Sequence, residues 1–177
     1  MLGELRARYP QVPTHVGGAE AVPLPDGSVD AVVAGQAAHW FDHGPAAVEL
    51  RRVLRPGGAV GLVWNTRDEE VAWVAALGRV LADVARGHAA DEDVVDAFAR
   101  ALGARVEHHR SGIVQRVSPE QVVAGIATRS YVATMDDVRR EEFLGEVRAV
   151  LDTHPDIRGR DLVDLPYRTD AYRLTPG

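Results

Sequence analysis

Three ring-bearing side chains, His39, Trp40 and Phe41, follow directly after an apolar run at 29–35. An imidazole titrates near neutral pH and can accept a proton, whereas aromatic faces attract cations and stack on flat ligands. The triplet could therefore pack a core, form a pocket wall or belong to a metal site. Taken alone, packing of the core and its loops is the commonest role of such rings.

A metal site at these rings would need further ligands. His39 and His43 are four residues apart with Asp42 between them, a spacing that suits chelation only on a helix. His108 and His109 are adjacent in an expected strand, so they point to opposite faces and cannot chelate together. The chain contains no cysteine. We expect no metal ion in this protein.

Two apolar runs must position the rings. The run 29–35 (VDAVVAG) predicts a strand buried on both faces, as in parallel sheets, and 59–64 (AVGLVW) predicts a second such strand. Periodicity and turn residues predict the other elements. Helices are expected at 2–9, 44–54, 69–86, 91–102 and 137–151 and from the Ser118-Pro119 capping box onward, and further strands at 14–17, 105–117 and 164–174.

Strands alternate with helices along the chain, which favours an α/β domain with a mostly parallel sheet. Ligands of such sheets bind beyond the carboxyl ends of the strands. The rings at 39–41 follow the end of the strand at 29–35. Their position is the first indication that they face a pocket.

Composition excludes several classes of protein. The length of 177 residues suits a single domain, 1–177, and a formal net charge of −6 disfavours nucleic-acid binding. No stretch reaches the roughly 20 apolar residues of a membrane span. The first ten residues lack the apolar region of a signal peptide. We expect a cytoplasmic protein with neither a membrane nor a nucleic acid as partner.

Three groups of residues resemble the class I S-adenosylmethionine-dependent methyltransferases, in particular the small-molecule branch. They are GGAEAVPLPDGSVDAVVAGQAAHWFD (17–42), ELRRVLRPGGAVGLVWN (49–65) and RSYVATM (129–135) with LPYRTDAYR (165–173). The resemblance implies the C-terminal two thirds of that fold. Its sheet would be partial and Rossmann-like, mostly parallel with an antiparallel closing strand, with helices on both faces.

The resemblance also implies S-adenosylmethionine as cofactor and a small-molecule acceptor. Beside the adenine it places Ala19 and Glu20, although Glu20 could equally be a solvated residue. Beneath the methionine part it places the residues that leave the strand. These are Gly35, Gln36 and Ala37.

The rings would follow as walls of the pocket, with Trp40 on the cofactor side and Phe41 on the acceptor side. His39 would lie beside the acceptor and is the candidate general base. Three further residues could line the acceptor side: Asn65, Arg129 and Tyr131. For Asn65 the alternative is a simple turn residue, and for the other two it is an ordinary helix-end surface.

The chain departs from the family pattern at its start. A first strand with a glycine-rich loop and a second strand with an acidic end are both missing, so we expect weak cofactor binding by this chain. The alternative function is a non-catalytic remnant that serves as an oligomerisation or binding module. A nucleotide-binding Rossmann protein of other chemistry is disfavoured without the glycine-rich loop. The strand 29–35 would have an unpaired apolar edge, and we therefore expect a homodimer through it.

Overall fold

The computed structural model describes residues 2–82 and 91–177. The end of the helix expected at 69–86 lies partly outside these residues. The chain order begins α1 (Leu2–Arg8), β1 (Val29–Gly35), the short 3₁₀ helix η1 (Ala38–Trp40), α2 (His43–Val53) and β2 (Leu54–Arg67). It continues with α3 (Ala72–Ala82), α4 (Asp91–Leu102), β3 (Ala104–Val117), α5 (Pro119–Ala127), α6 (Ser130–Ala133), α7 (Asp137–Thr153) and β4 (Val163–Pro176).

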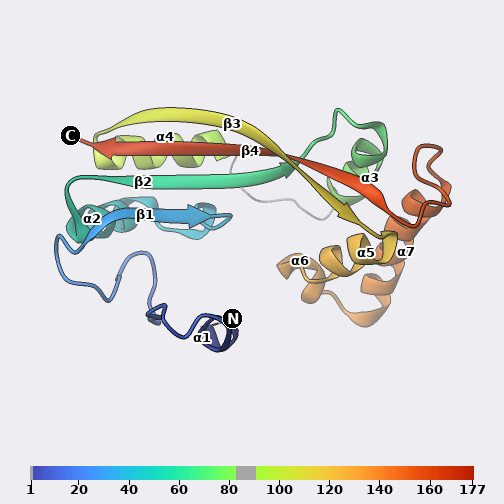
Figure 1. Cartoon of the computed structure of the whole chain (residues 1–177), viewed down its shortest axis with the longest axis horizontal. Coiled ribbons are helices and arrows are strands. Elements are labelled where there is room, and N and C mark those ends of the chain that lie inside the picture. The colour runs from blue at the N-terminus through green and yellow to red at the C-terminus, as the bar shows by residue number, and fades with distance from the viewer. Residues whose placement is uncertain (1, 83–90) are drawn as a thin grey trace. The chain divides into compact units, whose positions relative to one another are not determined.

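The four strands form one sheet in the order β1-β2-β4-β3. Strands β1 and β2 are parallel, with Val32 opposite Val60 and Gly35 opposite Val63. The closing strand β4 runs in the opposite direction to β2 and β3 (Figure 1). The prediction of an α/β fold with an antiparallel closing strand is confirmed.

The described chain divides into two compact units. Unit 1 comprises 1–63, 90–108 and 172–177, and unit 2 comprises 64–89 and 109–171. The prediction of one domain over 1–177 stays a prediction.

Unit 1 has a core between α2 and α4, which pack against each other. Residues Ala46 and Val53 of α2 and Phe98 and Leu102 of α4 are at most 1% exposed. Both helices bury residues three and four positions apart, so each presents one apolar stripe to the other. The first turn of α4 carries Asp91, which complements the helix dipole there.

Unit 2 has its own core, built around α3, α5 and α7. Helix α5 begins at a complete capping box: the Ser118 side chain accepts from the backbone N–H of Gln121, and the Gln121 side chain accepts from that of Ser118. The sequence prediction of this helix start is therefore confirmed. The core cluster includes Trp73, Leu77, Val122, Ile126, Phe143, Val147 and Val163.

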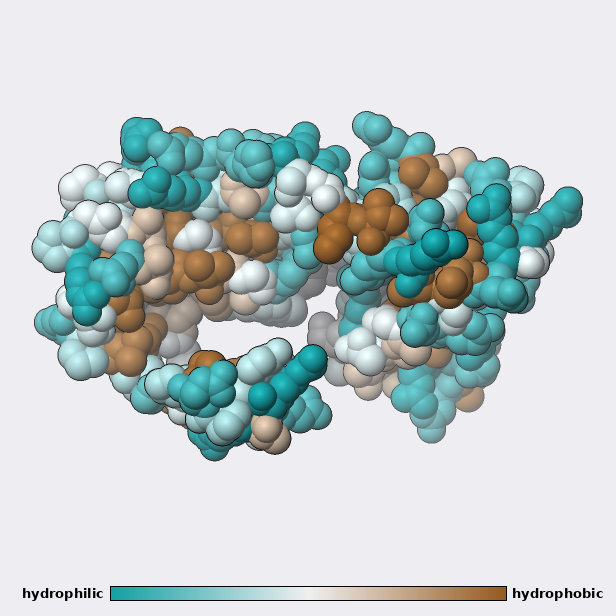
Figure 2. Space-filling model, in the orientation of Figure 1, coloured by the Kyte–Doolittle hydropathy of each residue, from teal (hydrophilic) through white to brown (hydrophobic). Residues whose placement is uncertain are grey.

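Two expectations about strands are wrong. Residues 14–17 form no strand, because this segment makes no ladder and only Gly18 bridges to Ala21. Strand β1 is not buried on both faces: Ala34 is its buried residue, whereas Val33 is 69% exposed. Figure 2 shows hydrophobic residues, in brown, among the hydrophilic residues of the surface.

Strand β1 lies at the edge of the sheet, where β2 is its one neighbouring strand among the described residues. The homodimer through 29–35 stays a prediction. No helix in the described part of the chain is long and apolar enough to cross a membrane.

Candidate functional site

The carboxyl end of β1 turns sharply at Gln36. This residue has a φ of 54°, in the left-handed region that is unfavourable for residues other than glycine. Its backbone N–H donates to the carbonyl oxygen of Val63 at 2.9 Å, which fixes the turn against β2. A Cβ atom at Gly35 would meet nothing within 4 Å. The chain thus holds a strained turn beside open space at the position where the sequence predicts a ligand.

The turn continues into η1. Its backbone is closed by a hydrogen bond from the N–H of Trp40 to the carbonyl oxygen of Ala37 at 2.9 Å, and Ala38 is fully buried beneath it. The rings of His39 and Trp40 lie side by side with centroids 5.1 Å apart. The Trp40 side chain faces solvent, since the residue is 63% exposed.

The next two rings contact α4. Phe41 meets Phe98 edge-on, with ring centroids 6.4 Å apart, and the His43 ring lies 5.0 Å from that of Phe98. The aromatic segment is therefore divided: the rings of His39 and Trp40 lie against each other, whereas Phe41 contributes to packing on α4. Within the described residues no group of three or more side chains could hold a metal ion.

The predicted adenine-side residues Ala19 and Glu20 form the turn between Gly18 and Ala21. The Glu20 carboxylate accepts a hydrogen bond from the backbone N–H of Asp42 at 2.9 Å. This bond brings the turn at 19–20 next to the segment that carries the rings. It also gives Glu20 a structural task at the start of α2, which the sequence did not reveal.

Two charged residues of α2 hold the chain after this turn. The Glu49 carboxylate accepts from the backbone N–H of Val22 at 2.8 Å. Arg52 donates to Glu49, to the carboxylate of Asp26 and to the carbonyl oxygens of Val22 and Leu24. These contacts fix residues 22–26 ahead of β1.

The same contacts shift two pKa values in opposite directions. The hydrogen bond from Arg52 lowers the pKa of Glu49, and the bonds to Glu49 and then Asp26 raise the pKa of Arg52. Sequence reasoning missed this network. The Glu-x-x-Arg spacing on an expected helix was the one available signal.

The predicted acceptor-side residues outside the aromatic segment lie in unit 2. Asn65 accepts a hydrogen bond from the Thr169 hydroxyl at 2.6 Å, so it links β2 to β4. Arg129 is exposed in the turn between α5 and α6, and the half-buried Tyr131 packs on the core of unit 2. The structure thus assigns Asn65 a cross-strand contact in place of a simple turn.

Arg67, the last residue of β2, was missed by the sequence analysis. Its Nε atom is buried and has no hydrogen-bond partner. Burial lowers the pKa of its guanidinium, and the nearby charge of Arg129 lowers it further. A WNTR segment at a strand end gives no local sign of such an environment.

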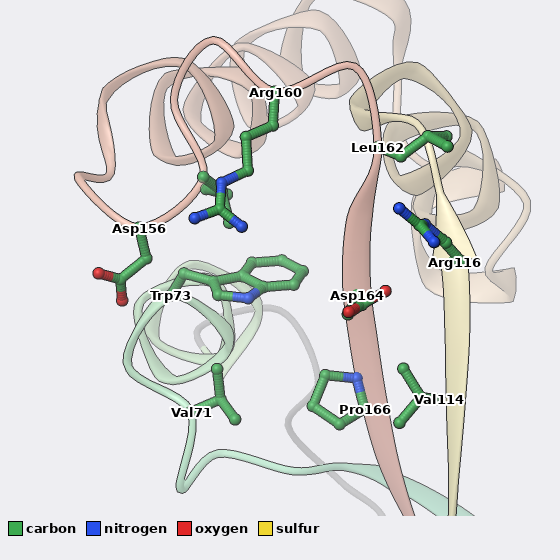
Figure 3. Close-up of a pocket in the computed structure, with 10 residues that line it drawn as sticks. Val71, Trp73, Val114, Arg116, Asp156, Arg160, Leu162, Asp164 and Pro166 are labelled. Carbon is green, nitrogen blue, oxygen red and sulfur yellow. The ribbon is translucent and has the colours of Figure 1, made fainter.

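Unit 2 also contains a cavity of about 480 Å³ (Figure 3). Its polar residues carry charges of both signs, Arg116 and Arg160 against Asp156 and Asp164, and its apolar wall includes Trp73. The lining contains none of the residues predicted from the sequence. The cavity is therefore separate from the residues that the resemblance selects.

Comparisons with known proteins identify the family of this chain. A family described as "Methyltransferase domain" matches residues 1–62. An uncharacterised methyltransferase of Mycobacterium bovis is 39% identical over 175 residues, which covers 99% of this chain and 70% of the relative. An uncharacterised methyltransferase of Schizosaccharomyces pombe is 31% identical, with 97% of this chain and 69% of the relative covered.

Solved structures show the same fold. A putative type II methyltransferase from Anaeromyxobacter dehalogenans is 26% identical, with a TM-score of 0.60 over 96% of this chain and 76% of that protein. A putative methyltransferase from an antibiotic biosynthesis pathway of Anabaena variabilis has a TM-score of 0.59 over 92% of this chain and 74% of that protein, at 23% identity. This chain belongs to the class I S-adenosylmethionine-dependent methyltransferases.

Proposed function

We propose that the protein transfers a methyl group from S-adenosylmethionine to a small-molecule acceptor. The observation that carries this proposal is the end of β1, where the left-handed Gln36 lies beside open space at Gly35. Family membership supports the reaction in general, and the exposed ring of Trp40 supports a ligand at this place.

The residues at the end of β1 fit the cofactor. Gly35, Gln36 and Ala37 would lie beneath its methionine part, where the free space at Gly35 admits a close approach. Ala19 and Glu20 would lie on the adenine side, since the Glu20–Asp42 bond brings their turn to this segment. When bound, S-adenosylmethionine supplies the methyl group on a sulfonium cation, to which an aromatic face such as that of Trp40 is attracted.

The protein's own contribution to such a reaction is mainly positioning. An in-line displacement is accelerated when the nucleophile is held against the methyl group. His39, next to Trp40, is the candidate to accept a proton from the acceptor, because an imidazole is the side chain best suited to this at neutral pH. Phe41 would support this wall from the α4 side.

The acceptor-side residues proposed in unit 2 are Asn65, Arg129 and Tyr131. Arg129 directly precedes the short α6 and Tyr131 lies in it. Asn65 is held by a hydrogen bond from Thr169. Their donors and acceptors suit a polar small molecule.

Calorimetric titration with S-adenosylhomocysteine tests the cofactor assignment. We expect weak but saturable binding by the wild-type chain and a further loss of about 1–3 kcal/mol in Glu20→Ala, the usual cost of an unsatisfied polar partner. Glu20→Gln separates the two tasks of this residue, because an amide oxygen can still accept from Asp42 but carries no charge. Exposed Glu4, on α1, provides the control variant Glu4→Ala.

The titration has clear contrary outcomes. Equal affinity of Glu20→Ala and Glu4→Ala would remove Glu20 from the site. A wild-type chain without saturable binding would refute the cofactor assignment as a whole.

A further inference from the structure

We propose that unit 2 binds an anionic small molecule, one that carries a carboxylate or a phosphate, through Arg67 and Arg129 with help from the hydroxyls of Tyr131 and Tyr167. All four residues belong to unit 2. The inference rests on the side chains of unit 2 and does not depend on the proposed methyl transfer.

Arg67 is held in place by the sheet. The backbone N–H of the next residue, Asp68, donates to the carbonyl oxygen of Pro166 at 3.0 Å, so Arg67 ends β2 beside the β4 segment that carries Tyr167. The side chain is half-buried, and its Nε atom is fully shielded from solvent. Within the described part of the chain, its guanidinium makes no hydrogen bond and no ion pair.

Such a shielded cation is costly unless it is paired. The charge of Arg129 increases this cost, because it has the same sign and repels Arg67. Among the described residues, Glu69 is the carboxylate whose charge acts on Arg67, and its influence ranks below those of Arg129 and the two tyrosines. Its carboxylate lies directly over Gly78 of α3 and is not bonded to the guanidinium.

Arg129 and the two tyrosines complete the donor set. Three hydrogen bonds fix the backbone of Arg129: its N–H donates to the carbonyl oxygen of Ile126 at 3.0 Å, and its carbonyl oxygen accepts from Val132 and from Ala133, each at 2.9 Å. Tyr131 and Tyr167 both pack on the core cluster of unit 2, and both act on the charge of Arg67. Neither the Arg129 guanidinium nor the two hydroxyls has a partner among the described side chains.

Two other arginines of unit 2, Arg110 and Arg168, are paired with a carboxylate. The nearly buried carboxylate of Asp170 accepts from Arg110 at 2.7 Å and from Arg168 at 3.1 Å. Arg67 differs from these two arginines because no carboxylate of the described residues is bonded to it, and it differs from the exposed Arg139 because its Nε atom is buried. Two guanidinium groups with two hydroxyls form a donor set that suits a carboxylate or phosphate.

Thermal unfolding in the presence of simple anions tests the anion site, and it does not require the natural ligand to be known. The probes are inorganic phosphate and malonate, each compared with sodium chloride at equal ionic strength. We expect at least one probe to raise the melting temperature of the wild-type chain by about 3 °C more than chloride at ten times its Kd. A preference for phosphate or for malonate identifies which anion the site takes.

The variants locate the effect. Arg67→Met and the exposed Arg129→Gln should both abolish the excess shift, and either variant alone suffices if the other is not folded. Arg139→Met removes an exposed, unpaired arginine of the same unit and should retain the shift. A wild-type chain that responds to both probes only as it does to chloride overturns the proposal, and so does an equal loss in Arg139→Met.

The outcome is independent of the cofactor experiment. Binding of S-adenosylhomocysteine without an anion effect would support the proposed cofactor and overturn the anion site. An anion effect without S-adenosylhomocysteine binding would support the anion site and overturn the cofactor assignment.

Discussion

Arg52 in unit 1 donates to two carboxylates and two carbonyl oxygens, whereas Arg67 in unit 2 donates to no described residue. Both side chains are half-buried. Their surroundings shift their pKa values in opposite directions, upward through Glu49 and Asp26 for Arg52 and downward through burial and Arg129 for Arg67. Shielding alone therefore does not tell what an arginine does.

The difference lies in which groups each arginine serves. Arg52 binds the segment 22–26 to α2, so its hydrogen bonds stabilise the fold. The guanidinium of Arg67, at the end of a strand, makes no hydrogen bond to a described residue, and burial lowers its pKa. The comparison separates an arginine that stabilises the fold from one that we propose binds a ligand.

The largest expected effect is a difference in sign between Arg52→Met and Arg67→Met. We expect Arg52→Met to lower the melting temperature more than any other variant described here, because it breaks three hydrogen bonds between α2 and residues 22–26 as well as those to Glu49 within α2. Arg67→Met should raise the free energy of unfolding by about 1 kcal/mol in anion-free buffer, since it removes a shielded, unpaired charge. Chemical denaturation followed by circular dichroism measures both, and an equal destabilisation by Arg67→Met would end the comparison.

An intermediate effect is expected at Asp170. Its carboxylate side chain is 9% exposed and pairs with Arg110 and Arg168, which are themselves 52% and 45% exposed. Asp170→Asn keeps one acceptor oxygen and loses the charge, so we expect a loss of about 1 kcal/mol after solvent screening. The same denaturation experiment checks this value. No loss at all would show that arginines of unit 2 gain nothing from a carboxylate.

The smallest effect concerns the pH dependence of Glu49. Its pKa lies below the usual value of 4.5, because Arg52 binds the ionised form. A lowered pKa in the folded state stabilises the fold above the unfolded pKa, and this stability is lost as the pH falls below about 4.5. We expect the stability difference between the wild-type chain and Glu49→Gln to shrink over that range. A constant difference from pH 7 to pH 3 would contradict the assignment.

Patterns of neighbouring residues correctly predicted the start of α5 and the position of β1. The Ser118 capping box marked the start of α5, and the apolar run 29–35 marked β1. The burial of β1 was not predictable, because it depends on which neighbours the strand has in the sheet. Residues 14–17 looked like a strand, but they have no partner strand and form none.

The candidate site was predictable to the extent that it lies on contiguous residues. The segment from Gly35 to Phe41 was identified directly, although the sequence did not show that its rings have different contact partners. The contacts of Arg52 with residues 22–26 span 26 to 30 positions along the chain. The shielding of Arg67 comes from the packing of unit 2. Neither leaves a local pattern in the sequence.

The exposure of the three tryptophans has a spectroscopic consequence. Trp40 is 63% exposed, whereas Trp64 and Trp73 are each 3% exposed. Iodide in solution should therefore quench the emission of Trp40 and leave that of the other two largely intact. The quenchable, red-shifted fraction of the fluorescence reports on the end of β1, and the protected fraction reports on the interior, so a single sample provides two separate optical signals.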